Sequence, residues 1–159
     1  MAVCVDSQPA TGAHNEVHST QLNPLGAVRL FSDGNEYVYL KGATSTVVDS
    51  VVVFQPGVWV GALAASGLKG SVAIARAVVD AATKYGWYLY IGSDTITAPS
   101  ATASNVPLFI GGVSGQFDDT AVKGDQILNA FVSNAAAAEG SAIIHINRAF
   151  IGHSNESTG

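Results

Sequence analysis

The amino-acid sequence predicts an all-β protein with a single small barrel or sandwich domain. Short apolar segments rich in Val, Ile, Tyr and Phe alternate with Gly, Pro, Asn and Asp. These turn signals recur about every 8 to 12 residues, the spacing typical of such folds. No long segment shows helical periodicity. The chain has 159 residues, 48% of them hydrophobic, which is long enough for one domain with its own core and short for two.

The expected strands follow one another between turn-forming residues. The first hairpin is marked by Asp33-Gly34, a common two-residue turn. Further strands are expected in YVYLKG, STVVDSVVVF, VWVGALAA, SVAIARAVVD, WYLYIGS, VPLFIGG, QILNAFV and SAIIHINRAFI. One or two short helical turns are expected: AATKYG is a short helical turn or a wide bend closed by Gly86, and AAAAEG is a helical segment only about one turn long.

Composition divides the chain into three parts. Residues 1–24 hold few large apolar side chains, so they are expected to form an extended N-terminal arm lying on a partner or on their own domain. Residues 25–151 form the β-rich domain, and residues 152–159 form a polar C-terminal tail.

Charged residues are unusually scarce. They make up 12% of the chain, about half of the usual share of roughly 25%, so Ala, Ser, Thr, Gly and Val must form much of the surface. Such a surface favours packing against other proteins. The net charge is -5 and the seven basic residues are scattered, which argues against a nucleic-acid partner.

The sequence also bears on the compartment. Cys4 is the single cysteine, so no internal disulfide framework is expected. The segment MAVCVDSQPA lacks a basic region followed by an apolar core, so it does not resemble a secretion signal. No apolar run reaches about 18 residues, so no membrane partner is expected. We expect a protein made in a cytoplasm.

Two pairs of polar residues have the residue types found in metal or catalytic sites. His14 and His18 are four apart in HNEVH, but the Glu stands third instead of second and the flanks favour turns, so no metal site is expected. Asp118 and Asp119 are adjacent, so on a strand they would point to opposite faces; we expect them in a turn.

His145 alternates with Ile144 and Ile146, so its side chain is expected on the face opposite to theirs. A hydrolase using Asp118, Asp119 or His145 would need at least two of these groups in one pocket. The sequence itself offers no catalytic set and no cofactor site, and we expect no enzymatic activity.

The segment KYGWYLYIG carries the densest group of aromatic residues. On a strand, Trp87, Leu89 and Ile91 share one face, which we expect in the core. Tyr88 and Tyr90 share the other face, which a loop or another subunit must cover. Because Tyr is favoured at protein interfaces, the second face is a candidate contact surface.

Four segments of the chain resemble a family of small tailed-phage virion proteins that act as head decoration, or cement, proteins. They are DGNEYVYLKGATSTVVDSVVVF, LKGSVAIARAVVDAATKYGWYLYIGS, FDDTAVKGDQILNAFVSN and AIIHINRAFI, and the resemblance covers roughly residues 25–151. It implies a β-rich protein without an active site. Such a protein binds the outer surface of the major capsid protein lattice, as a homodimer or homotrimer, and stabilises the expanded capsid.

Six residues are the candidate contacts of this binding protein: His14, His18, Leu22, Tyr88, Tyr90 and His145. The alternative is a virion-surface module that binds a glycan or a receptor. Its aromatic platform would use Tyr88, Tyr90 and Trp59, although no carboxylate or amide stands beside the tyrosines.

Overall fold

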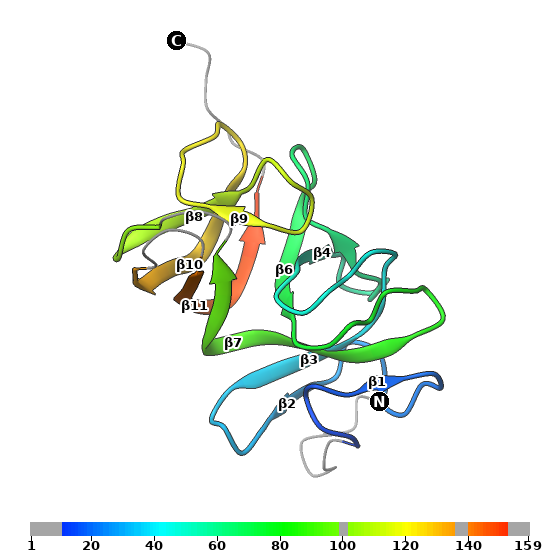
Figure 1. The fold of residues 1–159 in the computed structure, drawn as a ribbon. Helices are drawn as coiled ribbons and strands as arrows, with labels where there is room; N and C mark the ends of the chain where they lie inside the picture. Colours follow the sequence, from blue (N-terminus) through cyan, green and yellow to red (C-terminus); the bar gives the residue numbers. More distant parts are fainter. Residues whose placement is uncertain (1–10, 99–101, 136–139, 153–159) are drawn as a thin grey trace.

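A computed structural model describes residues 11–98, 102–135 and 140–152 of the chain. Within these ranges the protein is all-β without a helix, and its eleven strands form one open antiparallel sheet (Figure 1). The all-β prediction is therefore confirmed. No helix of the described ranges has the length and apolar character needed to cross a membrane.

The strands are β1 (Val17–His18), β2 (Val28–Leu30), β3 (Glu36–Lys41), β4 (Val51–Phe54), β5 (Ala62–Leu63), β6 (Gly70–Ala75), β7 (Tyr85–Ala98), β8 (Val106–Ile110), β9 (Phe117–Asp118), β10 (Gln126–Asn134) and β11 (Gly140–Ile151). The main path through the sheet runs β2-β3-β7-β6-β11-β10-β8-β9. Outside this path, β1 pairs with β7, β4 pairs with β6, and β5 pairs with β4.

The long strand β7 takes part in two regions of the sheet. Its first half pairs with β3 and β6, and its second half pairs with β11. Figure 1 shows β7 following β3 and then turning sharply toward β8 and β11. The turn lies at Gly92, whose φ is +130°, a conformation that glycine adopts readily and other residues do not.

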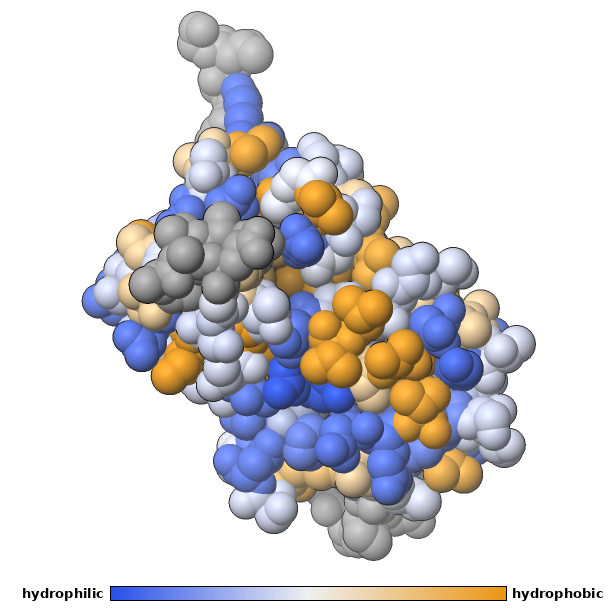
Figure 2. All heavy atoms as spheres, in the orientation of Figure 1, coloured by the Kyte–Doolittle hydropathy of each residue, from blue (hydrophilic) through white to orange (hydrophobic). Residues whose placement is uncertain are grey.

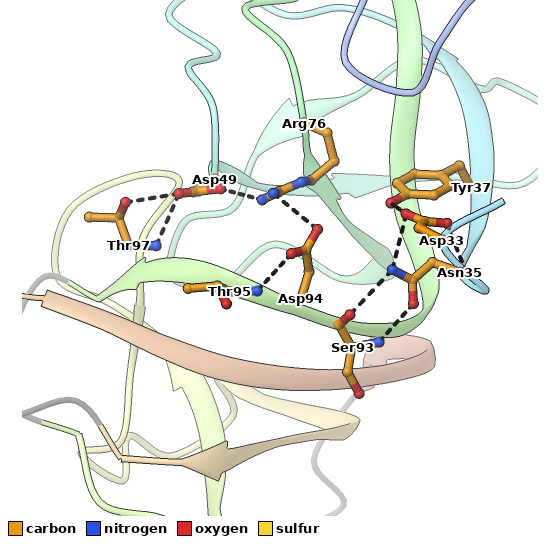
Figure 3. A network of polar contacts seen from close by, with 9 residues as sticks. All are labelled: Asp33, Asn35, Tyr37, Asp49, Arg76, Ser93, Asp94, Thr95 and Thr97. Carbon is orange, nitrogen blue, oxygen red and sulfur yellow. Dashed lines mark hydrogen bonds and ion pairs between the residues drawn. The ribbon is translucent and has the colours of Figure 1, made fainter. Parts of the chain in front are cut away.

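Asn35 supports this turn with its side chain. The N–H of Ser93 donates to Asn35 Oδ1 (3.1 Å), and Asn35 Nδ2 donates to the carbonyl of Ser93 (3.2 Å) (Figure 3). The amide side chain therefore takes the place of a neighbouring strand where the pairing of β3 with β7 ends.

We call the two regions the first wing (β1 to β6 and residues 85–91) and the second wing (residues 92–98 and β8 to β11). The main hydrophobic core lies between them and includes Trp87 and Leu89 from the first wing and Ile96 from the second. The positions of β7 that belong to the main core thus change from odd to even numbers across Gly92. The predicted burial of Trp87 is confirmed.

The opposite face of the first wing carries a second core. It consists of Val38, Leu40, Val52, Phe54, Ala73, Ala75, Ala77, Val79 and Tyr88. The segment after β6 folds back over this face, and a Cβ at Gly86 would lie only 2.6 Å from Val79 Cγ2. The chain therefore covers this face with its own residues.

Residues 11–24 lie against the sheet of their own chain. Val17 and His18 pair with Gly86 and Tyr85 as strand β1, and Trp87 Nε1 donates to the carbonyl of Thr11 (3.3 Å). Residues 1–10 of the expected arm and residues 153–159 of the expected tail lie outside the described residues.

Two finer predictions about the fold are corrected. The sheet is not a closed barrel, because β2 and β9 end the path without pairing with each other. The segment AATKYG is a turn closed by a hydrogen bond from the N–H of Lys84 to the carbonyl of Ala81 (2.9 Å), not a helical turn. The last two residues of the segment, Tyr85 and Gly86, belong to strand β7. The core of AAAAEG, residues 136–139, lies outside the described residues.

An ion-pair network joins the two wings. Arg76, just after β6, contacts Asp49 Oδ1 with Nη1 (2.5 Å) and Asp94 Oδ2 with Nη2 (3.0 Å). Asp49 Oδ2 also accepts hydrogen bonds from the N–H (3.0 Å) and the hydroxyl (2.8 Å) of Thr97 (Figure 3). The network ties the loop before β4 and the end of β6 to the second half of β7.

Replacing Gly92 by Ala should destabilise the fold by about 3 kcal/mol or more, from backbone strain and the lost hydrogen bonds of Asn35. The new Cβ would lie 1.9 Å from Asn35 Oδ1. Urea denaturation measures the free energy of unfolding. The matched control is Gly57→Ala, where φ is +93° but nothing lies within 4 Å, so about 1–2 kcal/mol is expected. Equal losses in the two variants would contradict the role given to Gly92.

Asp33 should make stability depend on pH in the acid range. Burial raises the pKa of Asp33, but hydrogen bonds from the hydroxyl of Tyr37 (2.6 Å) and the N–H of Asn35 (3.0 Å) outweigh it and hold the pKa below its ordinary value of 3.8. A lowered pKa stabilises the fold above the ordinary value, and this contribution is lost as the pH falls through the folded value.

Asp33→Asn should therefore unfold at lower urea concentration than the wild type at pH 7, and the difference should shrink as the pH falls below 3.8. Urea titrations across this range measure it. A difference that stays constant with pH would show that the carboxylate charge plays no part.

Candidate functional site

The second wing has an apolar face that nothing in the described chain covers. Residues such as Leu108, Val132 and Ile144 point into the main core, and the alternate positions point away from it. The apolar outward residues and His145, which we call the outer face, are Pro107, Phe109, Leu128, Phe131, Ile143, His145 and Phe150; Gln126, Ser133, Ser141 and Asn147 on the same strands are exposed as well. They come from β8, β10 and β11.

The outer face is organised in rows that run across the strands. Phe131 on β10 lies opposite Pro107 on β8 and opposite His145 on β11. The rings of Phe131 and His145 are 5.1 Å apart, and His145 Nδ1 lies 2.9 Å from the Ser93 hydroxyl on β7. A second row pairs Leu128 with Phe150. Phe131, 40% exposed, therefore stands near the centre of the face.

Two irregularities in the strands place these side chains together. Leu128 and Phe131 are three residues apart and would point to opposite faces of a regular strand. Between them Asn129 has a φ of 61°, and Arg148 on the facing strand has a φ of 48°. The register of β10 with β11 shifts at this place, so both apolar side chains point outward.

The outer face is also nearly uncharged. Among Asp, Glu, Lys and Arg, β8, β10 and β11 contain Arg148 alone. An antiparallel sheet with one uncovered face usually presents polar side chains there. At roughly 200 Å² for a whole side chain, Leu128, Phe131, Ile143 and Phe150 expose on the order of 300 Å², a size at which patches are often functional. The arrangement is suited to binding a protein.

His145 is the one predicted contact residue that lies on this face. It points away from the core, as the alternation predicted, while Ile144 and Ile146 are buried. Sequence analysis did not single out Phe131 or Leu128. A usable signal was present in the sequence: QILNAFVSN contains aromatic and aliphatic residues but no charge.

The three predicted contacts of the N-terminal segment contact their own sheet. His14 stacks on Tyr37 with the rings 4.9 Å apart, and His18 Nδ1 lies 2.8 Å from the Tyr39 hydroxyl. The N–H of Leu22 donates to the same hydroxyl (3.3 Å), although the Leu22 side chain is exposed. The prediction that His18 faces a partner is wrong, because its ring is buried under the segment itself.

Of the two covers expected for the face of Tyr88 and Tyr90, a loop or another subunit, the chain's own segment covers Tyr88, which is therefore not an exposed contact residue. Its side chain is 0% exposed, because residues after β6 fold over it in the second core. Tyr90 is half-buried beside Phe54, with ring centroids 5.8 Å apart. The ring centroid of Trp59 lies 5.9 Å from that of Phe54. Tyr90 and Trp59 thus both contact Phe54 at the margin of the second core, in which Tyr88 is buried.

The structure does not bring His145 together with Asp118 or Asp119, the other residues considered for a hydrolase. Asp118 accepts a hydrogen bond from the N–H of Thr120 (3.1 Å), and Asp119 accepts one from the N–H of Ala103 (3.0 Å). Burial raises the pKa of Asp118, but hydrogen bonds with Thr120 and Asp119 outweigh it and lower the pKa. Asp118 lies on β9, and β8 and β10 separate it from His145 on β11. The described residues contain no group of three or more His, Cys, Asp or Glu side chains placed to hold a metal ion.

An open groove lies between the loop before β4 and the turn before β9. It has room for about 230 Å³ and is lined by Ser45, Val47, Val48, Asp49, Ser50, Thr97, Ser114, Gly115 and Gln116. Val47 and Val48 are exposed. On the side of the molecule seen in Figure 2, hydrophobic residues gather in one group beside a band of hydrophilic ones. The Asp49 carboxylate is already occupied by Arg76 and Thr97, so the groove offers mainly neutral polar groups.

No protein-family model matches the sequence, and no curated protein matches it.

Replacing Tyr88 by Phe should stabilise the protein by about 1–2 kcal/mol, because the change removes a polar group that is buried without a partner. The Tyr88 hydroxyl has no hydrogen-bond partner, and burial raises the pKa of this side chain. Thermal or urea unfolding measures the change. The control is Tyr90→Phe, at a half-buried ring, with a change within about 0.5 kcal/mol. A destabilised Tyr88→Phe variant would mean that the hydroxyl is hydrogen-bonded to a buried water molecule.

Proposed function

We propose that this protein is a virion structural protein, a head decoration or cement protein. It binds the outer surface of a major capsid protein lattice and stabilises the expanded capsid. The observation that carries the proposal is the nearly uncharged apolar outer face of the second wing, in a chain with only 12% charged residues. The resemblance of residues 25–151 to tailed-phage decoration proteins supports the same conclusion.

The physical mechanism is stabilisation by mass action. A protein that binds the expanded lattice and not its disrupted form shifts the equilibrium toward the lattice, by RT ln(1 + [L]/Kd) for each site. Many weak contacts around one head, made by a homodimer or homotrimer, combine into high avidity. The net charge of -5 gives the protein no attraction to packaged DNA.

This proposal places the protein on the outer surface of the virion, after synthesis in the host cytoplasm. Its partners are the major capsid protein and further copies of itself, without nucleic acid, membrane, metal or cofactor.

Binding to capsids tests the proposal. The folded protein should co-sediment with expanded tailed-phage heads, formed by the capsid protein encoded alongside it, and should saturate at a fixed number of copies per head. The temperature at which the heads disrupt should rise with occupancy. Unexpanded heads are the control and should bind less. A folded protein that neither binds nor stabilises expanded heads would refute the proposal.

The aromatic cluster around Phe54 favours a second candidate, a glycan- or receptor-binding module on the virion surface. Trp59 is held in left-handed backbone conformation, with φ at 56°, and such strain is often found at binding sites. Trp87 is fully buried, so a saturable change of tryptophan fluorescence on adding a glycan would report on Trp59. Trp59→Phe should abolish that change, and a flat titration across glycan classes would reject this candidate.

A further inference from the structure

We propose that the outer face of the second wing binds a second copy of this chain, face to face, to form a two-fold symmetric dimer. The inference rests on the proposed function only in treating the outer face as a protein contact. The resemblance implies a homodimer or homotrimer without saying which surface forms it; the inference assigns the two-fold state and the face.

The two wings differ in what covers the face turned away from the main core. On the first wing, the face turned away from the main core is covered by the chain itself, with Ala77 and Val79 packed over Tyr88. On the second wing, the corresponding face carries Phe131, Ile143 and other apolar side chains and stays exposed. Two such sheet faces pack well against each other at about 10 Å. A second copy supplies the missing layer.

The charge distribution allows two copies to meet at the outer face. Each copy carries a net charge of -5, so two copies repel each other over most approaches. The outer face is different, because β8, β10 and β11 contain no Asp or Glu. Two copies can meet there without bringing carboxylates together. The remaining repulsion is long-ranged and is screened by salt, so self-association should strengthen as salt rises. Binding to a basic partner would weaken instead.

The area of the outer face is sufficient for a dimer contact. Strands spaced about 4.8 Å apart, at about 3.3 Å per residue, give the face formed by β8, β10, β11 and the end of β7 a footprint on the order of 600 Å². Standard interfaces bury about 800 Å² on each partner, and smaller ones are transient. The face is therefore large enough for a specific dimer of modest strength, and we expect dissociation in the micromolar range.

Two-fold symmetry would place Phe131 near the centre of the contact. A two-fold dimer uses the same patch on both copies, so a residue near the centre of the patch contacts its own equivalent or lies close to it. Phe131 lies between Pro107 and His145 in the row that crosses the face. Central aromatic residues contribute most to binding in such patches. Phe131 is therefore the residue whose replacement should weaken the dimer most.

Analytical ultracentrifugation of the full chain, from about 1 to about 200 µM, tests the proposal. The wild type should pass from monomer to dimer in this range, and the dimer should strengthen between about 0.05 and about 0.5 M salt. Phe131→Asp should remain monomeric throughout, with at least about tenfold weaker association. The matched control is Leu30→Asp, which makes the same charge change at a side chain 70% exposed on β2. It should dimerise like the wild type.

Circular dichroism and thermal melting check that each variant is folded. If Phe131→Asp does not fold, Ile143→Asp on the neighbouring strand makes the same test. A wild type that stays monomeric at every concentration, or a Leu30→Asp variant as impaired as Phe131→Asp, would overturn the proposal.

Head binding separates this proposal from the proposed function. A monomeric wild type that binds expanded heads, with binding lost in Phe131→Asp, would mean that the capsid protein occupies the outer face; self-association would be refuted and the proposed function would stand. A dimer that fails to bind heads would support self-association and refute the proposed function.

Discussion

The bend of β7 at Gly92 is the constraint on which the rest of the structure depends. One strand runs through both wings, so its change of direction sets the angle that encloses the main core. Asn35 satisfies the backbone inside the bend. Arg76 fixes the same angle from the core side by bridging Asp49 and Asp94. All three side chains of that bridge are mostly buried, and loss of one partner leaves an uncompensated charge in a poorly solvated place.

The two wings differ in how their outward faces are completed, and this difference connects the fold with the function. The first wing is closed by the segment after β6, which places Tyr88 in a second core. The second wing is a single layer whose outward side chains are apolar and nearly free of charge. In the described part of the chain, an exposed surface is therefore apolar and nearly uncharged, as expected of a protein that acts through contacts with other proteins.

Local patterns predicted much of this arrangement. Asp33-Gly34 lies in the turn joining β2 and β3, Trp87 and Leu89 are buried together, and His145 points away from Ile144. The core face predicted for β7 is confirmed for Trp87 and Leu89 but is wrong for Ile91, which is not part of the main core, because strict alternation assumes a regular strand. Strand irregularities depend on the pairing of strands distant in sequence, so the outward position of Phe131 could not be read from its spacing.

The sequence by itself determined the strand-rich class, the low charge and the local alternation of side chains, because each follows from composition or from the geometry of an extended backbone. Only the tertiary structure decided which faces are covered. Tyr88 is inside because Val79 folds back over the sheet, and Phe131 is outside because no described segment reaches it. Covering a face requires contacts between segments far apart in the chain, and local sequence patterns carry no information about them.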